Sequence, residues 1–368
     1  MRRVLIIAAA ILAAPAVAQG PGQLLSAEPV VDTPAGMQAW RVRYLTRDDR
    51  GAPSQVTGMV VAPREALPAR PRPVIAWTHG TSGIASQCAP SLLPGFWTLT
   101  PALEAVRRGY VVVAPDYPGL GSPGVHPYLV GTTTARSVLD AVRSAQAIPG
   151  AGAGQRFVVW GESQGGHAAL WTGQLASADG GRLQLLGVAA GAPPTDLAAN
   201  LRQASDPNAR TLLTALAVQS WSQHYGVPLR IGRPRTPGII QRLSRNCVSV
   251  DSGPKVGAIL GILALRQDLR SVDLARTPPW SSYVAANSPT PVSRVPILIA
   301  QARADPFVAP AVTRRFARRL CANRVRVRFL DLPGKDHAST AKQSSAQTLA
   351  WIDQRFAGTQ APSDCQRL

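Results

Sequence analysis

The chain has 368 residues, 45% of them hydrophobic, so it is long enough to bury one large core or two small ones. Its formal charge of +19 comes almost entirely from arginine, because lysine stands only at 255, 335 and 342. The arginines are spread along the chain without a dense block or interleaved aromatic residues, which excludes a nucleic-acid groove. We expect a solubilising surface, with adsorption to anionic lipid or cell-envelope surfaces as the functional alternative.

Residues 1–18 have the pattern of a secretory signal peptide. Met1-Arg2-Arg3 is followed by the apolar run from Val4 to Ala14 and by the small-x-small motif from Ala16 to Ala18. The apolar run is too short for a membrane anchor, and no cysteine stands there to carry a lipid. We therefore predict cleavage near Ala18 and a secreted protein, either periplasmic or extracellular.

The cysteines and histidines indicate disulfides rather than a metal site. Four cysteines in an exported chain predict two disulfides, and their number alone leaves three connectivities open. No Cys-x-x-Cys motif occurs, and the five histidines are scattered along the chain. We expect neither a bound metal nor a cofactor.

Short β-branched runs alternate with helical patterns, which predicts a mostly parallel sheet with helices on both faces. The eight expected strands are 40–45, 56–61, 74–78, 110–114, 157–160, 185–190, 297–300 and 325–330. The expected helices lie near 99–108, 133–147, 167–176, 310–320 and 341–356.

The segment 198–291 breaks this alternation, because it has helical patterns, prolines and glycines but no strand signal. Inserted between expected strands six and seven, it would lie above the carboxyl ends of the strands, where open α/β sheets bind ligands. We therefore expect a core of residues 19–197 and 292–368 and a helical cap or lid of residues 198–291. Within the cap, residues 256–265 are apolar all round, which fits either a buried cap helix or a helix lining an acyl-chain pocket.

The pentapeptide Gly161-Glu162-Ser163-Gln164-Gly165 is a Gly-x-Ser-x-Gly motif between a β-branched run and a helix-forming run. The two glycines permit a turn so tight that the serine Oγ is lifted above the sheet. The same turn directs the amide of Gln164 toward the place where an oxyanion would form. The motif is typical of a serine hydrolase, and its position after the fifth of eight strands is the α/β-hydrolase order.

A serine nucleophile needs a histidine base and a carboxylate that orients the histidine. In α/β-hydrolases the chain order is serine, acid, histidine. Two histidines follow the motif beyond its own helix: His224, inside the cap, and His337, in a loop after the last strand. We predict that His337 is the base. Asp305, just past the seventh strand, is the predicted acid, with Asp331 and Asp336 as rivals.

The loop after the third expected strand, His79-Gly80-Thr81, is the candidate for a second oxyanion donor. Its glycine lets the backbone approach a substrate, so we predict that the amide of Thr81 acts together with that of Gln164. His79, His126 and His167 are expected to support the structure rather than to act as bases.

These stretches, together with the sequence around them, resemble the secretory lipase family, the lipase-A-like branch of the α/β-hydrolases. The matching sequences are His79-Gly80-Thr81 with Cys88-Ala89-Pro90-Ser91, residues 113–121, Gly161 to Gly166, Ala304-Asp305 and Asp336-His337. The resemblance extends from roughly Val30 to the C-terminus and includes the cap.

The resemblance implies a triacylglycerol lipase or carboxylesterase that uses Ser163, Asp305 and His337 through an acyl-enzyme, without a cofactor. It also implies two disulfides, Cys88–Cys247 and Cys321–Cys365. The first would tether the cap beside the oxyanion loop, and the second would tie the C-terminal tail to the edge of the sheet. The expected partner is a lipid or ester substrate, with no nucleic acid and no obligate protein partner. Acyl chain length stays open, because the cap carries no recognisable motif.

Two other functions are compatible with the motifs. A secreted serine peptidase on the same fold would use the same three residues, but the apolar cap helix and the lack of an acidic cluster for a peptide amine favour esters. An envelope or lipid-binding protein with a decayed hydrolase fold is the non-enzymatic alternative. The presence of all three catalytic residues argues against it.

Overall fold

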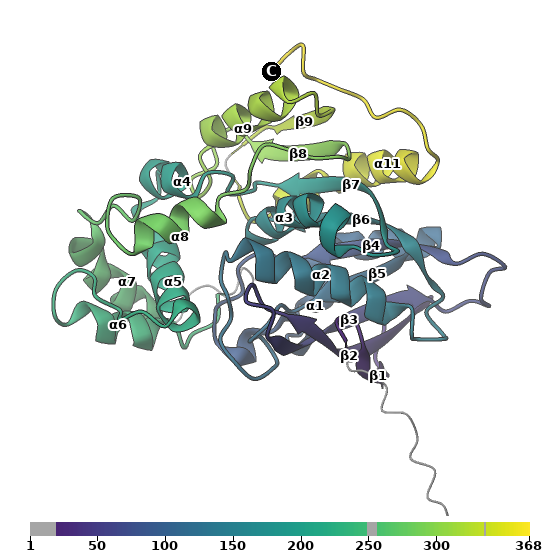
Figure 1. The fold of residues 1–368 in the computed structure, drawn as a ribbon, viewed down its shortest axis with the longest axis horizontal. Helices are drawn as coiled ribbons and strands as arrows, with labels where there is room; N and C mark the ends of the chain where they lie inside the picture. Colours follow the sequence, from purple (N-terminus) through teal and green to yellow (C-terminus); the bar gives the residue numbers. More distant parts are fainter. Residues whose placement is uncertain (1–19, 249–255, 335) are drawn as a thin grey trace, which may run out of the picture.

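The computed structural model describes residues 20–248, 256–334 and 336–368 (Figure 1). The expected signal peptide and its cleavage site near Ala18 lie outside these residues. None of the described helices combines the length and the apolar character that crossing a membrane requires.

One sheet of nine strands forms the centre of the described chain, in the order β1-β2-β3-β5-β4-β6-β7-β8-β9. The first three strands are antiparallel to their neighbours, and all pairs from β5 to β9 are parallel. The strands are β1 (Leu24–Val30), β2 (Met37–Arg47), β3 (Pro53–Pro63), β4 (Arg72–Thr78), β5 (Val111–Pro115), β6 (Ala153–Glu162), β7 (Gln184–Gly191), β8 (Ile297–Ala302) and β9 (Val327–Leu332).

All eight expected strands are present as β2 to β9, but the expected number of strands is wrong by one. The additional strand, β1, lies at the edge of the sheet and pairs with β2. Its side chains are partly or fully exposed along its whole length, so its sequence lacks an alternating apolar pattern. It also contains Pro29, which sheets accept at their edges.

Helices cover both faces of the sheet. Along β4 the side chains alternate: Val74 and Ala76 pack with α2, α3 and α9, whereas Ile75 and Trp77 pack with α11 and a 3-10 helix. The helices outside the 192–296 segment are α1 (Phe96–Leu99), α2 (Gly131–Ala145), α3 (Gln164–Asp179), α9 (Pro310–Ala322), α10 (Thr340–Gln343) and α11 (Ser345–Phe356), with 3-10 helices at Ser86–Cys88, Pro90–Leu92 and Pro101–Arg108. The helix expected near 99–108 is therefore mostly 3-10, and the last expected helix is divided in two.

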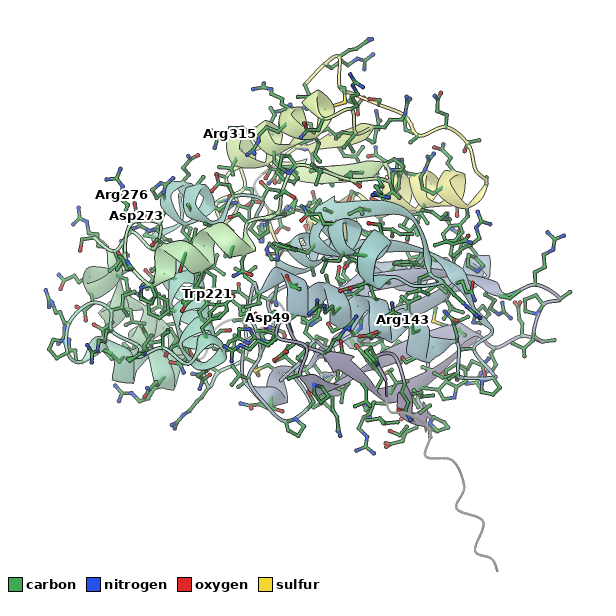
Figure 2. All side chains as sticks on the ribbon, in the orientation of Figure 1. Asp49, Arg143, Trp221, Asp273, Arg276 and Arg315 are labelled. Carbon is green, nitrogen blue, oxygen red and sulfur yellow. A yellow bond between two sulfur atoms is a disulfide. The ribbon has the colours of Figure 1, made fainter. Side chains whose placement is uncertain are left out.

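Between β7 and β8, the described part of the chain contains five helices and no strand. They are α4 (Leu197–Gln203), α5 (Pro207–Tyr225), α6 (Thr236–Leu243), α7 (Val256–Leu269) and α8 (Trp280–Asn287). The apolar cluster of this helical insertion includes Trp280 on α8 and Trp221 on α5, which is labelled in Figure 2, and it also takes in residues 128–130 of the core. It lies beside the sheet in Figure 1, and it occupies the segment that the sequence marks as a cap.

Two disulfides connect distant parts of the chain. Cys88, in the loop after β4, is joined to Cys247, in the segment after α6 of the helical insertion. Cys321, in α9, is joined to Cys365 in the C-terminal tail. These are the pairs that the family resemblance implies. The first crosslink holds the helical insertion against the loop that carries His79-Gly80-Thr81.

Candidate active site

The turn between β6 and α3 holds Ser163 in a strained backbone conformation, with φ 54° and ψ −118°. Positive φ is uncommon for residues other than glycine, and such strain is typical of functional sites. A Cβ added at Gly161 would overlap Thr78 Oγ1, and one added at Gly165 would overlap the Thr78 carbonyl oxygen. The two glycines are therefore required for the turn to pass so close to β4.

The structure brings the three residues of the predicted catalytic triad into hydrogen-bond contact. His337 Nε2 lies 2.8 Å from Ser163 Oγ, and His337 Nδ1 lies 2.7 Å from Asp305 Oδ2. The three side chains come from the ends of different strands: Ser163 follows β6, Asp305 follows β8, and His337 follows β9. This is the arrangement of nucleophile, base and orienting acid that serine hydrolases share.

Asp305 is buried and receives hydrogen bonds on both carboxylate oxygens. The amides of Phe307 and Val308 donate to Oδ1 at 2.8 and 3.0 Å, and Gln301 Nε2 donates to Oδ2 at 2.9 Å. The ring of Phe307 also stacks on the imidazole of His337, with centroids 5.0 Å apart. The carboxylate and the imidazole are thus both fixed in orientation before a substrate arrives.

The two rival acids have other contacts. Asp331 pairs with Arg303 and Arg314 at the surface. Asp336 accepts hydrogen bonds from the Ala338 amide and the Ser339 hydroxyl, so it stabilises the loop in which His337 lies. Among the described residues, the imidazole of His337 is hydrogen-bonded to Asp305 and to neither of these two carboxylates.

Glu162, the residue before the serine, is a further part of the site that the motif alone does not reveal. Its Oε1 accepts a hydrogen bond of 2.8 Å from the amide of Ala341, four residues after His337. Burial raises the pKa of Glu162 to about 7, although the Ala341 amide and His337 both act to lower it. A partly buried carboxyl therefore links the serine turn to α10, the helix that follows the histidine loop.

On the other side of Ser163 lies the loop predicted to bind the oxyanion. A Cβ built at Gly80 would lie 3.7 Å from the Cβ of Ser163, so this loop passes directly beside the serine. The hydroxyl of Thr81 lies 2.8 Å from that of Tyr128, which holds the loop in place. The amide of Gln164 is at the start of α3, where helix amides have no partner within the helix. Gln164 thus follows the nucleophile directly, and Thr81 follows the glycine that passes beside it.

His126 fixes the side chain of Gln164. Its Nε2 lies 2.9 Å from Gln164 Nε2, and its Nδ1 lies 3.1 Å from the carbonyl oxygen of Pro118. Burial lowers the pKa of His126 to about 3, so the ring is neutral. The neutral tautomer with hydrogen on Nδ1 donates to Pro118 and accepts from Gln164. No sequence signal indicated this contact.

The remaining histidines have structural contacts. His79 lies between the carbonyl oxygens of Gly80 and Asp116, and its ring stacks on Tyr117. His167 Nε2 is 2.7 Å from the carbonyl oxygen of Asn287, and burial lowers its pKa to about 4. His224 pairs with Asp49 at 2.9 Å and joins α5 to a loop of the core. In the described residues, no group of three or more His, Cys, Asp or Glu side chains is placed to hold a metal ion.

A narrow cavity of about 40 Å³ adjoins the serine. It is lined by Tyr128, Leu129, Ser163, Gln164, Pro194, Leu197, Asn200, Leu201, Ala204, Arg210, Leu213, Ala217, Trp221, Phe307 and Val308. The wall on the side of the helical insertion comes from α4 and α5. No residue of α7 lines this cavity, so the cavity does not support the hypothesis that residues 256–265 line an acyl pocket. The alternative, a buried helix, is only half right, because one face of α7 is exposed.

Comparison with known proteins agrees with the geometry of the site. The family described as secretory lipase matches residues 98–364 of this chain. A probable inactive lipase of Mycobacterium tuberculosis is 25% identical over 353 residues, which cover 88% of this chain and 75% of the relative. Lipase 5 of Candida albicans is 24% identical over 366 residues, with coverage of 91% and 76%.

Among solved structures, Candida antarctica lipase A is similar to this chain with a TM-score of 0.74 and 18% identity, covering 94% of this chain and 84% of the lipase. At this identity the likeness establishes the α/β-hydrolase fold. The match of the family over more than half of the sequence establishes the relationship: this chain is a member of the secretory lipase family.

Proposed function

We propose that this protein is an exported serine hydrolase that cleaves carboxylic esters, with triacylglycerols among its substrates. The observation that carries the proposal is the continuous hydrogen-bond chain from Ser163 Oγ through His337 to Asp305, at 2.8 and 2.7 Å. Membership of the secretory lipase family supports the choice of esters over amides.

The geometry suits acyl transfer in two steps. Ser163 Oγ attacks the ester carbonyl carbon while His337 Nε2 takes its proton, and Asp305 stabilises the imidazolium. The amides of Gln164 and Thr81 donate to the oxyanion of the tetrahedral intermediate. His337 then protonates the leaving alcohol, and the acyl group stays on Ser163. Water, deprotonated by His337, attacks this acyl-enzyme and releases the carboxylic acid.

The cavity beside Ser163 is the proposed site for the acyl chain. Leu197, Leu201, Leu213 and Ala217 give it an apolar wall, and apolar contacts contribute about 0.8 kcal/mol for each buried methylene. Its small volume accommodates only a short part of a chain, so longer chains require α4 and α5 to shift. We therefore propose that the helical insertion acts as a cap whose helices α4 and α5 move to admit longer acyl chains.

Export is proposed from the N-terminal signal pattern together with the two disulfides, because disulfides persist in oxidising compartments. Mass spectrometry of the mature protein from the periplasm or the medium should find Gln19 as the N-terminal residue. A protein retained in the cytoplasm with Met1 intact would contradict this part of the proposal.

The test of the activity uses a fluorophosphonate probe, which reacts with an activated serine whatever the natural substrate is. The probe should label the protein but not the Ser163→Ala variant. Paired p-nitrophenyl ester and p-nitroanilide amide substrates should show turnover of the ester alone, and emulsified triglyceride tests the lipase assignment. An unlabelled protein would contradict the proposal and would match the relative described as probably inactive. Faster turnover of the amide would identify a peptidase.

A further inference from the structure

Helix α7 is apolar on both of its faces, but only one face is buried. The inner face packs against α5 and α6 in the core of the helical insertion through Ala258, Ile262 and Leu265. The outer face carries four apolar side chains at the i, i+3, i+4 and i+7 positions of one helix side: Val256, Ile259, Leu260 and Leu263. These four side chains are between 41% and 72% exposed. We call them the apolar stripe; a contiguous exposed patch of this kind marks an interaction surface.

A cationic groove of about 720 Å³ begins where the apolar stripe ends. It lies between α5 and α7 and is lined by Pro207, Arg210, Thr211, Thr214, Leu263, Arg266, Gln267, Leu269 and Arg270. Three of these residues are arginines and none is acidic. Leu263 belongs both to the stripe and to the groove, so the two features are continuous along one face of α7.

The acidic residues nearest to the groove in sequence form ion pairs or hydrogen bonds with groups other than the groove arginines. The carboxylate of Asp268 is buried on the opposite side of α7, where Arg233 and Arg235 approach it at 3.4 and 3.6 Å. Asp273 pairs with Arg202 and Arg276 near the end of the helical insertion (Figure 2). Asp206 accepts hydrogen bonds from the first amides of α5. Asp273 also lines an adjoining cavity with Arg210 and Arg270, but its ion pairs are with Arg202 and Arg276. The positive charge of the groove is therefore available to a ligand from outside.

We propose that the apolar stripe and the arginine groove together form a docking site for an anionic lipid surface. The stripe inserts among the acyl chains, and Arg210, Arg266 and Arg270 bind phosphate groups of the lipid headgroups. Charge complementarity selects this partner: a free anion would leave the stripe in water, and an uncharged apolar partner would leave the arginines without a counter-charge.

The docking site adjoins the catalytic cavity. Arg210 lines both the arginine groove and the cavity at Ser163. A lipid surface held on α7 is therefore presented next to the place where an ester would enter. Docking involves no bond cleavage, so this inference goes beyond the proposed function. Binding to lipid can therefore be measured in the absence of hydrolysis.

The experiment measures co-sedimentation of the full mature chain, carrying Ser163→Ala to prevent hydrolysis, with phospholipid vesicles. Vesicles of equimolar phosphatidylcholine and phosphatidylglycerol should bind the protein, pure phosphatidylcholine vesicles should bind it much more weakly, and added salt should reduce the difference. The double variant Arg266→Gln, Arg270→Gln should reduce partitioning into the anionic vesicles about thirtyfold, because each arginine at an anionic leaflet contributes about a factor of five. The double variant Leu260→Ser, Leu263→Ser should also bind less.

Matched controls separate the site from the general charge and hydrophobicity of the protein. Arg315→Gln, Arg319→Gln removes two exposed arginines from α9, which lies far from α7 in Figures 1 and 2, and should leave binding within about twofold of the parent. Leu67→Ser, Leu92→Ser removes two exposed leucines of similar exposure elsewhere.

With Ser163 restored, all four variants should hydrolyse a soluble acetate ester and unfold thermally like the parent, which establishes that they are folded. Equal losses in the α7 and α9 arginine variants would assign binding to net charge and overturn the proposal. Equal binding to both kinds of vesicle, or unchanged binding of both α7 variants, would overturn it as well.

Discussion

Glu162 Oε1 accepts a hydrogen bond of 2.8 Å from the amide of Ala341, so the residue beside the nucleophile is bound to the short helix that follows the loop of the base. The contact is partly buried, and it connects the end of β6 with α10. Two segments 179 residues apart in the chain are joined by one carboxyl group.

The raised pKa of Glu162 predicts a pH dependence of stability that the Glu162→Gln variant should lack. Burial raises this pKa from 4.5 to about 7, so between these values the folded protein holds a proton that the unfolded chain has released. Stability contributed by Glu162 is therefore present at low pH and is lost as the pH rises through this window, by at most about 1.4 kcal/mol per pH unit. Urea unfolding from pH 4.5 to 8 should show this slope as the difference between the parent and Glu162→Gln. The same change at the exposed Glu65 is the control, and identical pH profiles of the parent and Glu162→Gln would contradict the prediction.

The choice of Asp305 as the acid predicts a ranking of three substitutions. Asp305→Asn should lower kcat for a soluble ester by about three to four orders of magnitude, because the amide favours the wrong tautomer of His337. Asp331→Asn removes only surface ion pairs with Arg303 and Arg314, and it should change kcat less than threefold, since such pairs contribute at most about 1 kcal/mol to stability. Steady-state kinetics on Asp305→Asn, Asp331→Asn and Asp336→Asn decide which residue is the acid. A larger loss at Asp331 or Asp336 than at Asp305 would show that the acid is misassigned.

The lining of the cavity predicts which substitution changes acyl chain preference. Ala217 lies on α5 and faces the cavity, so Ala217→Leu should lower kcat/KM for longer p-nitrophenyl esters by about fourfold for each methylene excluded. Acetate ester turnover should change little. Gly261→Leu on α7 is the matched control, because a Cβ at this position would contact only Leu243, at 3.6 Å, and neither residue lines the cavity. Thermal unfolding monitors the cost of overpacking, which is about 1–3 kcal/mol at a buried site. A chain-length change in Gly261→Leu but not in Ala217→Leu would move the acyl site to α7.

The two disulfides predict a defined peptide map and a ranking of stability losses. Non-reducing digestion should recover Cys88 with Cys247 and Cys321 with Cys365. The bridges span 159 and 44 residues, so the chain-entropy model gives losses of about 5 and 4 kcal/mol when each pair is replaced by serine. Denaturant unfolding of the two double variants measures these losses. Recovery of Cys88 joined to Cys321 would disprove the tether between the helical insertion and the oxyanion loop.

Much of the catalytic site follows from local sequence, because its parts lie at strand ends that periodicity reveals. Ser163 is marked by its glycines, and Asp305 and His337 are marked by their positions after the last two strands. The contacts that orient them were not predictable. Gln301 and Phe307 lie close to Asp305 in sequence, and this proximity is the only signal that could have suggested a role for them. The Glu162–Ala341 and His126–Gln164 contacts join residues 179 and 38 positions apart, and no local pattern encodes them.

The sequence by itself determined the order of the elements, the nucleophile turn and the position of the helical insertion, since apolar periodicity and glycine placement act over a few residues. Only the tertiary structure decided which surfaces are covered. The sequence does not predict β1, because an edge strand needs no apolar pattern. It also does not predict which side of α7 is covered, because an apolar helix has no sequence mark that tells which side its neighbours occupy. Burial is set by the packing of α5 and α6 against one face of α7, and that packing depends on residues far away in the chain.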